Sequence, residues 1–97
     1  MVNVEKPTSI IAWVRNINEG DVKYATFPRS RAVSIRSTVS GYNATLGHDR
    51  GIFVHIRFAY DFEVAILVCE SKEEVELNKG TENEYKWREK IEPPYNR

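Results

Sequence analysis

Two apolar, alternating runs joined by a tight turn constrain the fold of this chain more than any other feature. Residues 52–58 alternate between apolar and mixed positions, and residues 62–69 repeat the pattern with an even more apolar composition. Period-two alternation is typical of β-strands that bury one face. Tyr60 and Asp61 stand between the runs and provide a turn. The two runs therefore predict an antiparallel hairpin.

A second hairpin is predicted nearer the start of the chain. Residues 9–17 carry apolar side chains at both odd and even positions, which is typical of a strand covered on two faces. Residues 18–21, Asn-Glu-Gly-Asp, form a turn sequence because Gly permits positive φ and Asn and Asp hydrogen-bond locally. Residues 22–27 alternate again and end at Pro28. We expect these two runs to pair.

The segment 30–46 between the hairpins has helical spacing. Its apolar residues recur every three or four positions, which places them on one helix face. They are Ala32, Ile35, Val39, Tyr42 and Leu46. Ser30 is the expected N-cap, Gly47 the expected C-terminal cap, and residues 48–51 a polar connection. Residues 33–35 include β-branched side chains, so an extended conformation there is the alternative.

The chain after Cys69 predicts short helices. Ser71 with Glu74, and Thr81 with Glu84, match the capping-box pattern and would open helices over 72–78 and 82–91. Trp87 and Ile91 are four residues apart and would dock together on the sheet, and residues 95–97 are expected to fray.

These elements predict one α+β domain spanning all 97 residues, with a core at 8–70 and a helical tail at 71–97. The expected architecture is a four-stranded, mainly antiparallel sheet in the order β-β-α-β-β, packed with one helix and followed by the helical tail.

Charge is unevenly distributed along the chain, although the total is zero. Residues 22–60 hold six bases and one acid, a net charge of +5, whereas residues 1–21 carry −1 and residues 61–97 carry −4. Such asymmetry is typical of a surface that binds anions. The alternative is that the acidic and basic segments neutralise each other across the fold.

Residues that would support catalysis or metal binding are scarce. The chain has two histidines and one cysteine, with no metal-ligand spacing and no glycine-rich phosphate loop. The string Gly47-His48-Asp49-Arg50-Gly51 occurs in some α/β-hydrolases, but this chain lacks their length and βα repeats. We therefore expect no enzyme, no cofactor and no metal. The longest apolar run is far too short for a bilayer span, and no secretion signal is evident, so a cytoplasmic location is expected.

Basic and hydroxyl side chains gather where the 30–46 helix is expected to begin. Helix N-termini, arginines and hydroxyls all bind phosphates in nucleic-acid complexes. A solvated polar helix face is the alternative. The expected phosphate contacts are Arg29, Ser30, Arg31, Arg36, Ser37, Arg50 and Arg57.

Aromatic and basic residues also share one side of the 52–58 strand. Phe53, His55 and Arg57 alternate there, and Tyr60 follows. An open sheet face of this kind stacks nucleic-acid bases. In the alternative, the C-terminal helix covers this face and Phe53 lies in the core.

The stretch Arg29-Ser-Arg-Ala-Val-Ser-Ile-Arg-Ser37, continued by Tyr42, Gly47, Gly51, Phe53 and Arg57, resembles small uncharacterised bacteriophage proteins with a Ser-Ile-Arg-Ser helix before a Gly/Phe/Arg strand. The resemblance covers about residues 28–68. Those proteins carry lysines where this chain has Asn43, Ala44 and Thr45. The resemblance implies a viral origin, and a host cytoplasmic location, more than a function.

Two functions are therefore expected from the sequence. The first is non-catalytic nucleic-acid binding, to DNA rather than RNA, through the arginines and strand aromatics named above. The second is a protein-interaction module, such as a phage inhibitor or cofactor of a host RNA polymerase or defence complex. Tyr85, Trp87 and Tyr95 would be exposed anchors for that role. Either hairpin could also donate an edge to a symmetric dimer.

Overall fold

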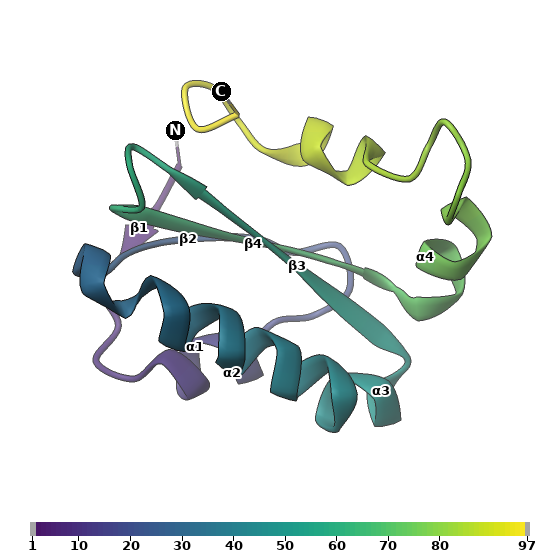
Figure 1. Cartoon of the computed structure of the whole chain (residues 1–97), viewed down its shortest axis with the longest axis horizontal. Helices are drawn as coiled ribbons and strands as arrows, with labels where there is room; N and C mark the ends of the chain where they lie inside the picture. Colours follow the sequence, from purple (N-terminus) through teal and green to yellow (C-terminus); the bar gives the residue numbers. More distant parts are fainter. Residues whose placement is uncertain (1, 97) are drawn as a thin grey trace.

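A computed structural model describes residues 2–96 and contains one mixed four-stranded sheet with helices around it (Figure 1). The strands lie in the spatial order β1-β2-β4-β3, so β1 and β3 form the two edges. In chain order the elements are β1 (Val4–Glu5), α1 (Ile10–Arg15), β2 (Val22–Thr26), the 3₁₀ turn η1 (Arg29–Arg31), α2 (Ala32–Ala44), α3 (Leu46–Arg50), β3 (Ile52–Ala59), β4 (Val64–Ser71), α4 (Lys72–Asn78) and the 3₁₀ helix η2 (Lys86–Lys90).

The predicted central hairpin is confirmed as β3 and β4, and the α+β class with four strands is confirmed with it. The ladder runs from Ile52 opposite Ser71 to Ala59 opposite Val64. Phe62 was expected to begin the second strand, but it lies in the turn with φ 69°, after Tyr60 and Asp61 at 53° and 55°. Three consecutive positive φ values reverse the chain before β4 begins.

The predicted first hairpin is wrong, because most of residues 9–17 form helix α1. Ser9 caps this helix, with its Oγ accepting a hydrogen bond from the Ala12 amide at 3.3 Å. Ile10, Trp13, Val14 and Ile17 are buried together at helical spacing, whereas Ile11 is exposed. A run with apolar residues at both odd and even positions fits a buried strand and a buried helix equally well. Periodicity alone therefore led to the wrong prediction.

Strand β1 takes the place of the missing hairpin partner. It is only two residues long and pairs in parallel with β2, with Val4 opposite Tyr24. Helix α1 forms the crossover between these two strands, as a parallel connection requires. The first part of the chain is therefore a small βαβ unit rather than a β-hairpin.

The predicted helix 30–46 is confirmed as a helix with shorter bounds. Ser30 is not its N-cap, because residues 29–31 form a 3₁₀ turn and no side chain caps α2. The helix ends where Thr45 adopts φ −120° and ψ −95°, and the expected loop that follows is helix α3. Gly47 is packed against Tyr42, where a Cβ would meet the Tyr42 carbonyl oxygen at 3.0 Å. The left-handed cap is instead Gly51, with φ 69°.

The tail is partly as expected. Helix α4 is confirmed, with Ser71 Oγ accepting from the Glu74 amide at 3.1 Å. The second capping sequence gives only turns and η2 rather than a helix over 82–91. Trp87 and Ile91 nevertheless dock on the sheet as predicted, with 8% and 1% of their surfaces exposed. Tyr95 does not fray, because its ring packs against that of Tyr24, with the ring centroids 5.3 Å apart. Arg97 lies outside the described residues.

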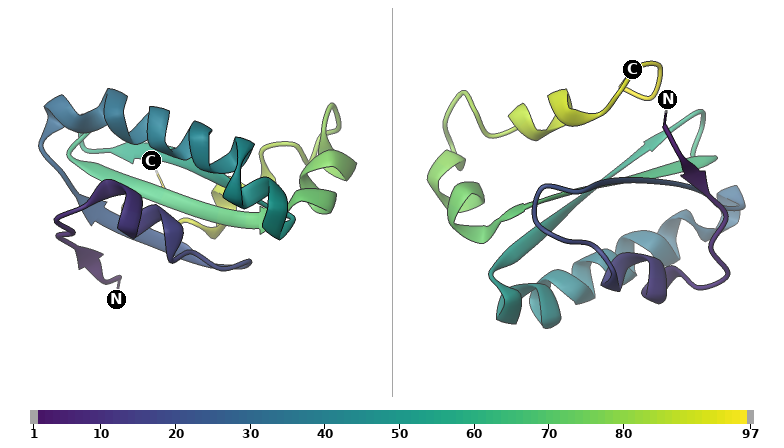
Figure 2. Two further views of the ribbon diagram at one scale, coloured as in Figure 1. Left: turned by 90° about the horizontal axis from the view of Figure 1, so that it is seen from below. Right: turned by 180° about the vertical axis from the view of Figure 1, so that it is seen from behind.

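The sheet is covered on both faces (Figure 2). Helices α1 and α2 cover one face, where their apolar side chains pack with Val54, Leu67 and Cys69. Residues 81–96, here called the C-terminal segment, run along the opposite face and place Trp87 and Ile91 on Ile66 and Val68. The tail is thus one wall of the core. No helix among residues 2–96 is long and apolar enough to cross a bilayer.

Candidate functional site

Strand β3 is the long edge of the sheet, and the hydrogen bonds around it show which of its backbone groups point outward. The carbonyl of Cys69 accepts from the Gly20 amide, and the amide of Cys69 donates to Asp21, so Cys69 bonds toward β2. Cys69 lies opposite Val54 in the ladder. Antiparallel pairs alternate between bonded and non-bonded, so the backbone groups of Val54 point away from β4.

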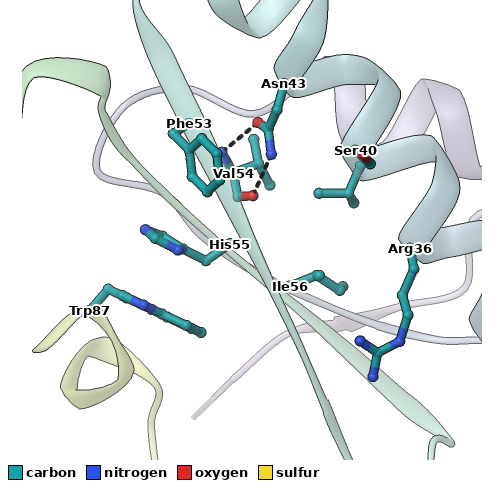
Figure 3. A pocket seen from close by; sticks show the side chains of 9 residues that line it. Arg36, Ser40, Asn43, Phe53, Val54, His55, Ile56 and Trp87 are labelled. Atoms are coloured by element: carbon teal, nitrogen blue, oxygen red, sulfur yellow. Dashed lines mark hydrogen bonds between the residues drawn. The ribbon is translucent and has the colours of Figure 1, made fainter. Parts of the chain in front are cut away.

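An asparagine side chain covers the outward groups of Val54. Asn43 Nδ2 donates to the Val54 carbonyl oxygen at 2.9 Å, and the Val54 amide donates to Asn43 Oδ1 at 2.8 Å. The carboxamide therefore imitates the peptide group of a neighbouring strand at this one position (Figure 3).

Ile56 and Phe58, the next alternate residues along β3, have no such side-chain hydrogen bonds among the residues that the structure describes. By alternation, the amides and carbonyls of Ile56 and Phe58 also point away from β4. Within residues 2–96, no side chain or other strand is hydrogen-bonded to them. Unpaired outward groups of this kind are a template for an additional strand.

A groove lies beside Ile56, the first of these two residues. It is here called the edge groove and has a volume of about 410 Å³. Figure 3 shows it between helix α2 on one side and Trp87 on the other, with β3 between them. The lining residues are Arg36, Val39, Ser40, Asn43, Phe53, Val54, His55, Ile56 and Trp87.

A second hollow, of about 400 Å³, continues from the edge groove toward α4. The two hollows share Asn43, Phe53, His55 and Trp87. Together they form a depression along one end of β3 that is bounded by α2, α4 and the C-terminal segment.

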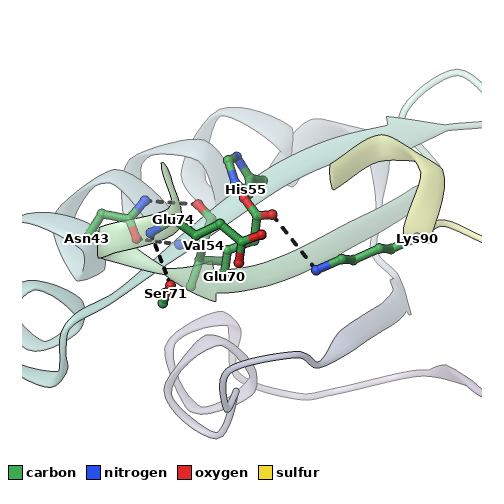
Figure 4. Close-up of polar contacts among 7 residues, drawn as sticks. All are labelled: Asn43, Val54, His55, Glu70, Ser71, Glu74 and Lys90. Atoms are coloured by element: carbon green, nitrogen blue, oxygen red, sulfur yellow. Dashed lines mark hydrogen bonds and ion pairs between the residues drawn. The ribbon is translucent and has the colours of Figure 1, made fainter. Parts of the chain in front are cut away.

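The wall of the groove is held by a polar cluster on the C-terminal side (Figure 4). His55 Nε2 lies 2.8 Å from Glu70 Oε2, and Lys90 Nζ lies 3.8 Å from Glu70 Oε1. The His55 ring is stacked on Trp87, with ring centroids 4.3 Å apart and planes 9° from parallel. Glu70, which is 92% buried, thus contacts His55 on β3 and Lys90 in the C-terminal segment.

Burial lowers the pKa of His55, against the opposing effect of the Glu70 carboxylate. Removing the ring from water penalises the imidazolium form, whereas the hydrogen bond to Glu70 favours it. The net direction favours the neutral ring over the imidazolium, and a ring with its proton on Nε2 would donate that proton to the Glu70 carboxylate.

Two arginines lie at the open end of β3. The Arg36 guanidinium from α2 lies 5.0 Å from the centre of the Phe58 ring. Side chains alternate along a strand, so Arg57, between Ile56 and Phe58, belongs to the opposite face of the sheet. Neither forms an ion pair with a carboxylate in the described part of the chain.

The other arginines expected to bind phosphate have different surroundings. Arg29 forms ion pairs with Asp61 at 2.9 Å and Glu63 at 3.5 Å. Arg50 donates to the Ile17 carbonyl oxygen, the Tyr42 hydroxyl and Asn18 Oδ1 at 2.7–3.0 Å. These hydrogen bonds attach the α1–β2 loop to α2 and α3, so the Arg50 guanidinium already has protein partners. The exposed remainder of the group at the start of α2 is Ser30, Arg31 and Ser37.

The aromatic residues also differ from expectation. The face of Phe53 and His55 is covered, because Trp87 takes the stacking position that a base was expected to occupy. Of the two expectations for Trp87, docking on the sheet is confirmed and the role of an exposed anchor is wrong, because only 8% of its surface is exposed. Tyr60 is half exposed and meets the Tyr95 ring edge to face at 5.6 Å. Tyr85 is 60% exposed, with Arg88 over its ring.

Sequence reasoning missed the roles of Asn43 and Glu70. Both contacts join residues more than ten positions apart, and no motif around either residue signals them. Cys69 is buried, and burial raises the pKa of its thiol to about 11. No group of three metal-ligating side chains occurs among residues 2–96.

Comparisons of the chain with protein-family models, with curated proteins and with solved structures found no match. The site must therefore be interpreted from its own geometry.

Proposed function

We propose that this chain is a non-catalytic protein-binding module that receives an extended segment of a partner along β3. The observation that carries the proposal is the pair of outward, unpaired peptide groups at Ile56 and Phe58, of which Ile56 lines the edge groove. Strand addition uses such groups: main-chain hydrogen bonds supply affinity, and pockets beside the strand supply specificity.

The surroundings of β3 favour one added strand. A neighbouring strand would lie about 4.8 Å from β3, between α2 and the C-terminal segment. Asn43 closes the edge at Val54, so pairing would begin at Ile56 and extend toward the β3–β4 turn. Trp87, which forms a wall of the groove, is fixed by its stack on His55 and needs little ordering when a partner binds.

Nucleic-acid binding is the second candidate, supported by the exposed Ser30, Arg31 and Ser37 at the start of α2 and by Arg36 and Arg57 nearby. It has less support than strand addition, because Arg29 and Arg50 already have protein partners and Trp87 covers the stacking face. Three remaining arginines would give a log–log salt slope of roughly −2 to −3. A titration with single- and double-stranded DNA at low salt measures this slope directly.

Peptide selection with amide mapping tests the leading proposal. Random twelve-residue peptides selected against the full chain should shift the Ile56 and Phe58 amide resonances of the labelled protein. Ile56→Pro should abolish binding, because it removes an outward donor that the β4 ladder does not use. Ile56→Ala is the matched control: it truncates the same side chain, keeps the amide and should retain binding. Binders that tolerate Ile56→Pro, or a failure to select any binder, would contradict the proposal.

A further inference from the structure

The residues around the open edge of β3 also specify the chemistry of the segment that would pair with it. Successive side chains of an added strand point to opposite faces of the sheet. The side chain opposite Arg57 would lie on the face of the C-terminal segment, and those opposite Ile56 and Phe58 would lie on the face of α2. This assignment holds for a parallel or an antiparallel partner.

Arg57 would have its nearest new neighbour directly opposite. Side chains opposite each other on adjacent strands have Cβ atoms about 4.5–5.5 Å apart, and opposite charges at that distance stabilise the pair. Arg57 is half-buried and has no carboxylate partner within residues 2–96. An acidic side chain is therefore the favoured residue opposite Arg57.

The position opposite Phe58 has a second cation. Arg36 reaches from α2 over the Phe58 ring, with its guanidinium 5.0 Å from the ring centre. A partner side chain beside Phe58 would lie on this same face, within reach of the guanidinium. An aspartate or glutamate there would add a charge-assisted hydrogen bond.

The position opposite Ile56 faces a different environment. The edge groove next to Ile56 is lined by the apolar side chains of Val39 and Val54, and by Ser40 at its rim. A medium-sized apolar side chain would bury surface there without leaving a charge in the groove.

A second copy of the chain fits this edge poorly. A two-fold axis that paired Ile56 of one copy with Phe58 of the other would place Arg57 directly opposite Arg57. Like charges directly opposite each other destabilise paired strands. Arg57, which attracts an acidic segment, therefore disfavours self-association through β3 in this register.

We infer that the partner of β3 is an extended segment with three consecutive residues, apolar, acidic and acidic, placed opposite Ile56, Arg57 and Phe58. The inference rests on the proposed function, since it names the partner of that same site. The apolar residue occupies the edge groove, and the two carboxylates pair with Arg57 and Arg36 on opposite faces of the added strand.

Three synthetic nine-residue peptides test this inference by nuclear magnetic resonance titration of the labelled full chain. All share a Thr/Val frame, and their centres are Leu-Glu-Glu, Leu-Gln-Gln and Leu-Lys-Lys. Each exposed ion pair is worth up to about 1 kcal/mol, or about two- to fivefold in affinity. With two such pairs, the Leu-Glu-Glu peptide should bind about four- to twenty-fivefold more tightly than Leu-Gln-Gln, and Leu-Lys-Lys should bind most weakly.

Charge reversal supplies the control. Arg57→Glu should weaken binding of the Leu-Glu-Glu peptide and strengthen that of Leu-Lys-Lys, whereas Lys6→Glu, next to β1 at the other sheet edge, should leave the order unchanged. Unshifted β4 amides would show that each variant is folded.

The outcomes separate the inference from the proposed function. Equal affinity for the Glu and Gln peptides, with shifts at Ile56 and Phe58, would overturn the acidic partner but retain strand addition. Absence of those shifts with all three peptides would overturn both. A thymidine oligonucleotide that shifts Arg36 and Arg57 where no peptide does would assign the surface to nucleic acid instead.

Discussion

The two edges of the sheet differ in length and in cover. Strand β1 has two residues, and Glu5 on it accepts a hydrogen bond from the Trp13 indole at 3.2 Å, so this edge is short and tied to α1. Strand β3 has eight residues, and among residues 2–96 a side chain, that of Asn43, is hydrogen-bonded to the outward groups of Val54 alone. Natural sheets usually protect long edges against pairing. The long edge that stays open beside a groove is therefore the region to which we assign function.

The largest expected effect comes from removing the wall of the groove. Trp87→Ala deletes a ring that is buried on the sheet and stacked on His55, so it should lower the free energy of unfolding by about 3–5 kcal/mol. Tyr85→Ala, two residues away and mostly exposed, should change it by less than about 0.5 kcal/mol. Chemical denaturation measures both. Similar values for the two variants would show that the C-terminal segment does not form a wall.

Removing the cover from Val54 should have the next largest effect. Asn43→Ala leaves an amide and a carbonyl of Val54 without partners, which should cost about 1–3 kcal/mol of stability. Ser40→Ala, an exposed position on the same helix, should be nearly neutral. If the two variants unfold at the same denaturant concentration, Asn43 does not close the edge.

Acidification should loosen the polar cluster behind the groove. Since the pKa of His55 is lowered in the folded state, the unfolded chain binds a proton more readily than the folded chain. The contribution of neutral His55 is complete above its unfolded pKa of about 6.5 and falls as pH drops from there through the folded pKa. The loss of stability between pH 7.5 and pH 5 should be smaller in His55→Gln than in the unsubstituted chain. An equal loss of stability in both proteins would show that a group other than His55 causes the pH dependence. His48→Gln, at the other histidine, is the control substitution.

The smallest effect concerns self-pairing of the long edge. Arg57→Leu removes the like charge that would face its copy across a two-fold axis, so self-association should strengthen by about two- to fivefold. Sedimentation at several concentrations measures this change, with Lys6→Leu as the control at the short edge. Weaker self-association of Arg57→Leu than of the unsubstituted chain would show that Arg57 does not disfavour pairing of two β3 edges.

Sequence periodicity predicted much of the fold because several elements had one dominant period. Residues 22–26, 52–58 and 64–69 alternate, and 32–44 repeat at helical spacing, and all form the expected type of element. The prediction of a strand at residues 10–15 was wrong because apolar side chains occupy both odd and even positions there. Strand β1 was missed because two residues are too few to show a periodic pattern.

The site was less predictable than the fold. Arg36, Arg57, His55 and Trp87 were all singled out from sequence, but their meeting around one strand depends on β3 lying at an edge. Edge position follows from the β1-β2-β4-β3 order, which local patterns do not contain. The cover of Val54 by Asn43 is likewise a tertiary contact.

Amide hydrogen exchange along β3 tests the open edge most directly. The Arg57 amide bonds to β4 and the Val54 amide to Asn43, so both should exchange slowly in the free protein. The amides of Ile56 and Phe58 should exchange much faster, and Asn43→Ala should bring Val54 to their rate. Protection of Ile56 and Phe58 equal to that of Arg57 in the free protein would contradict an open edge, and with it the proposed binding role.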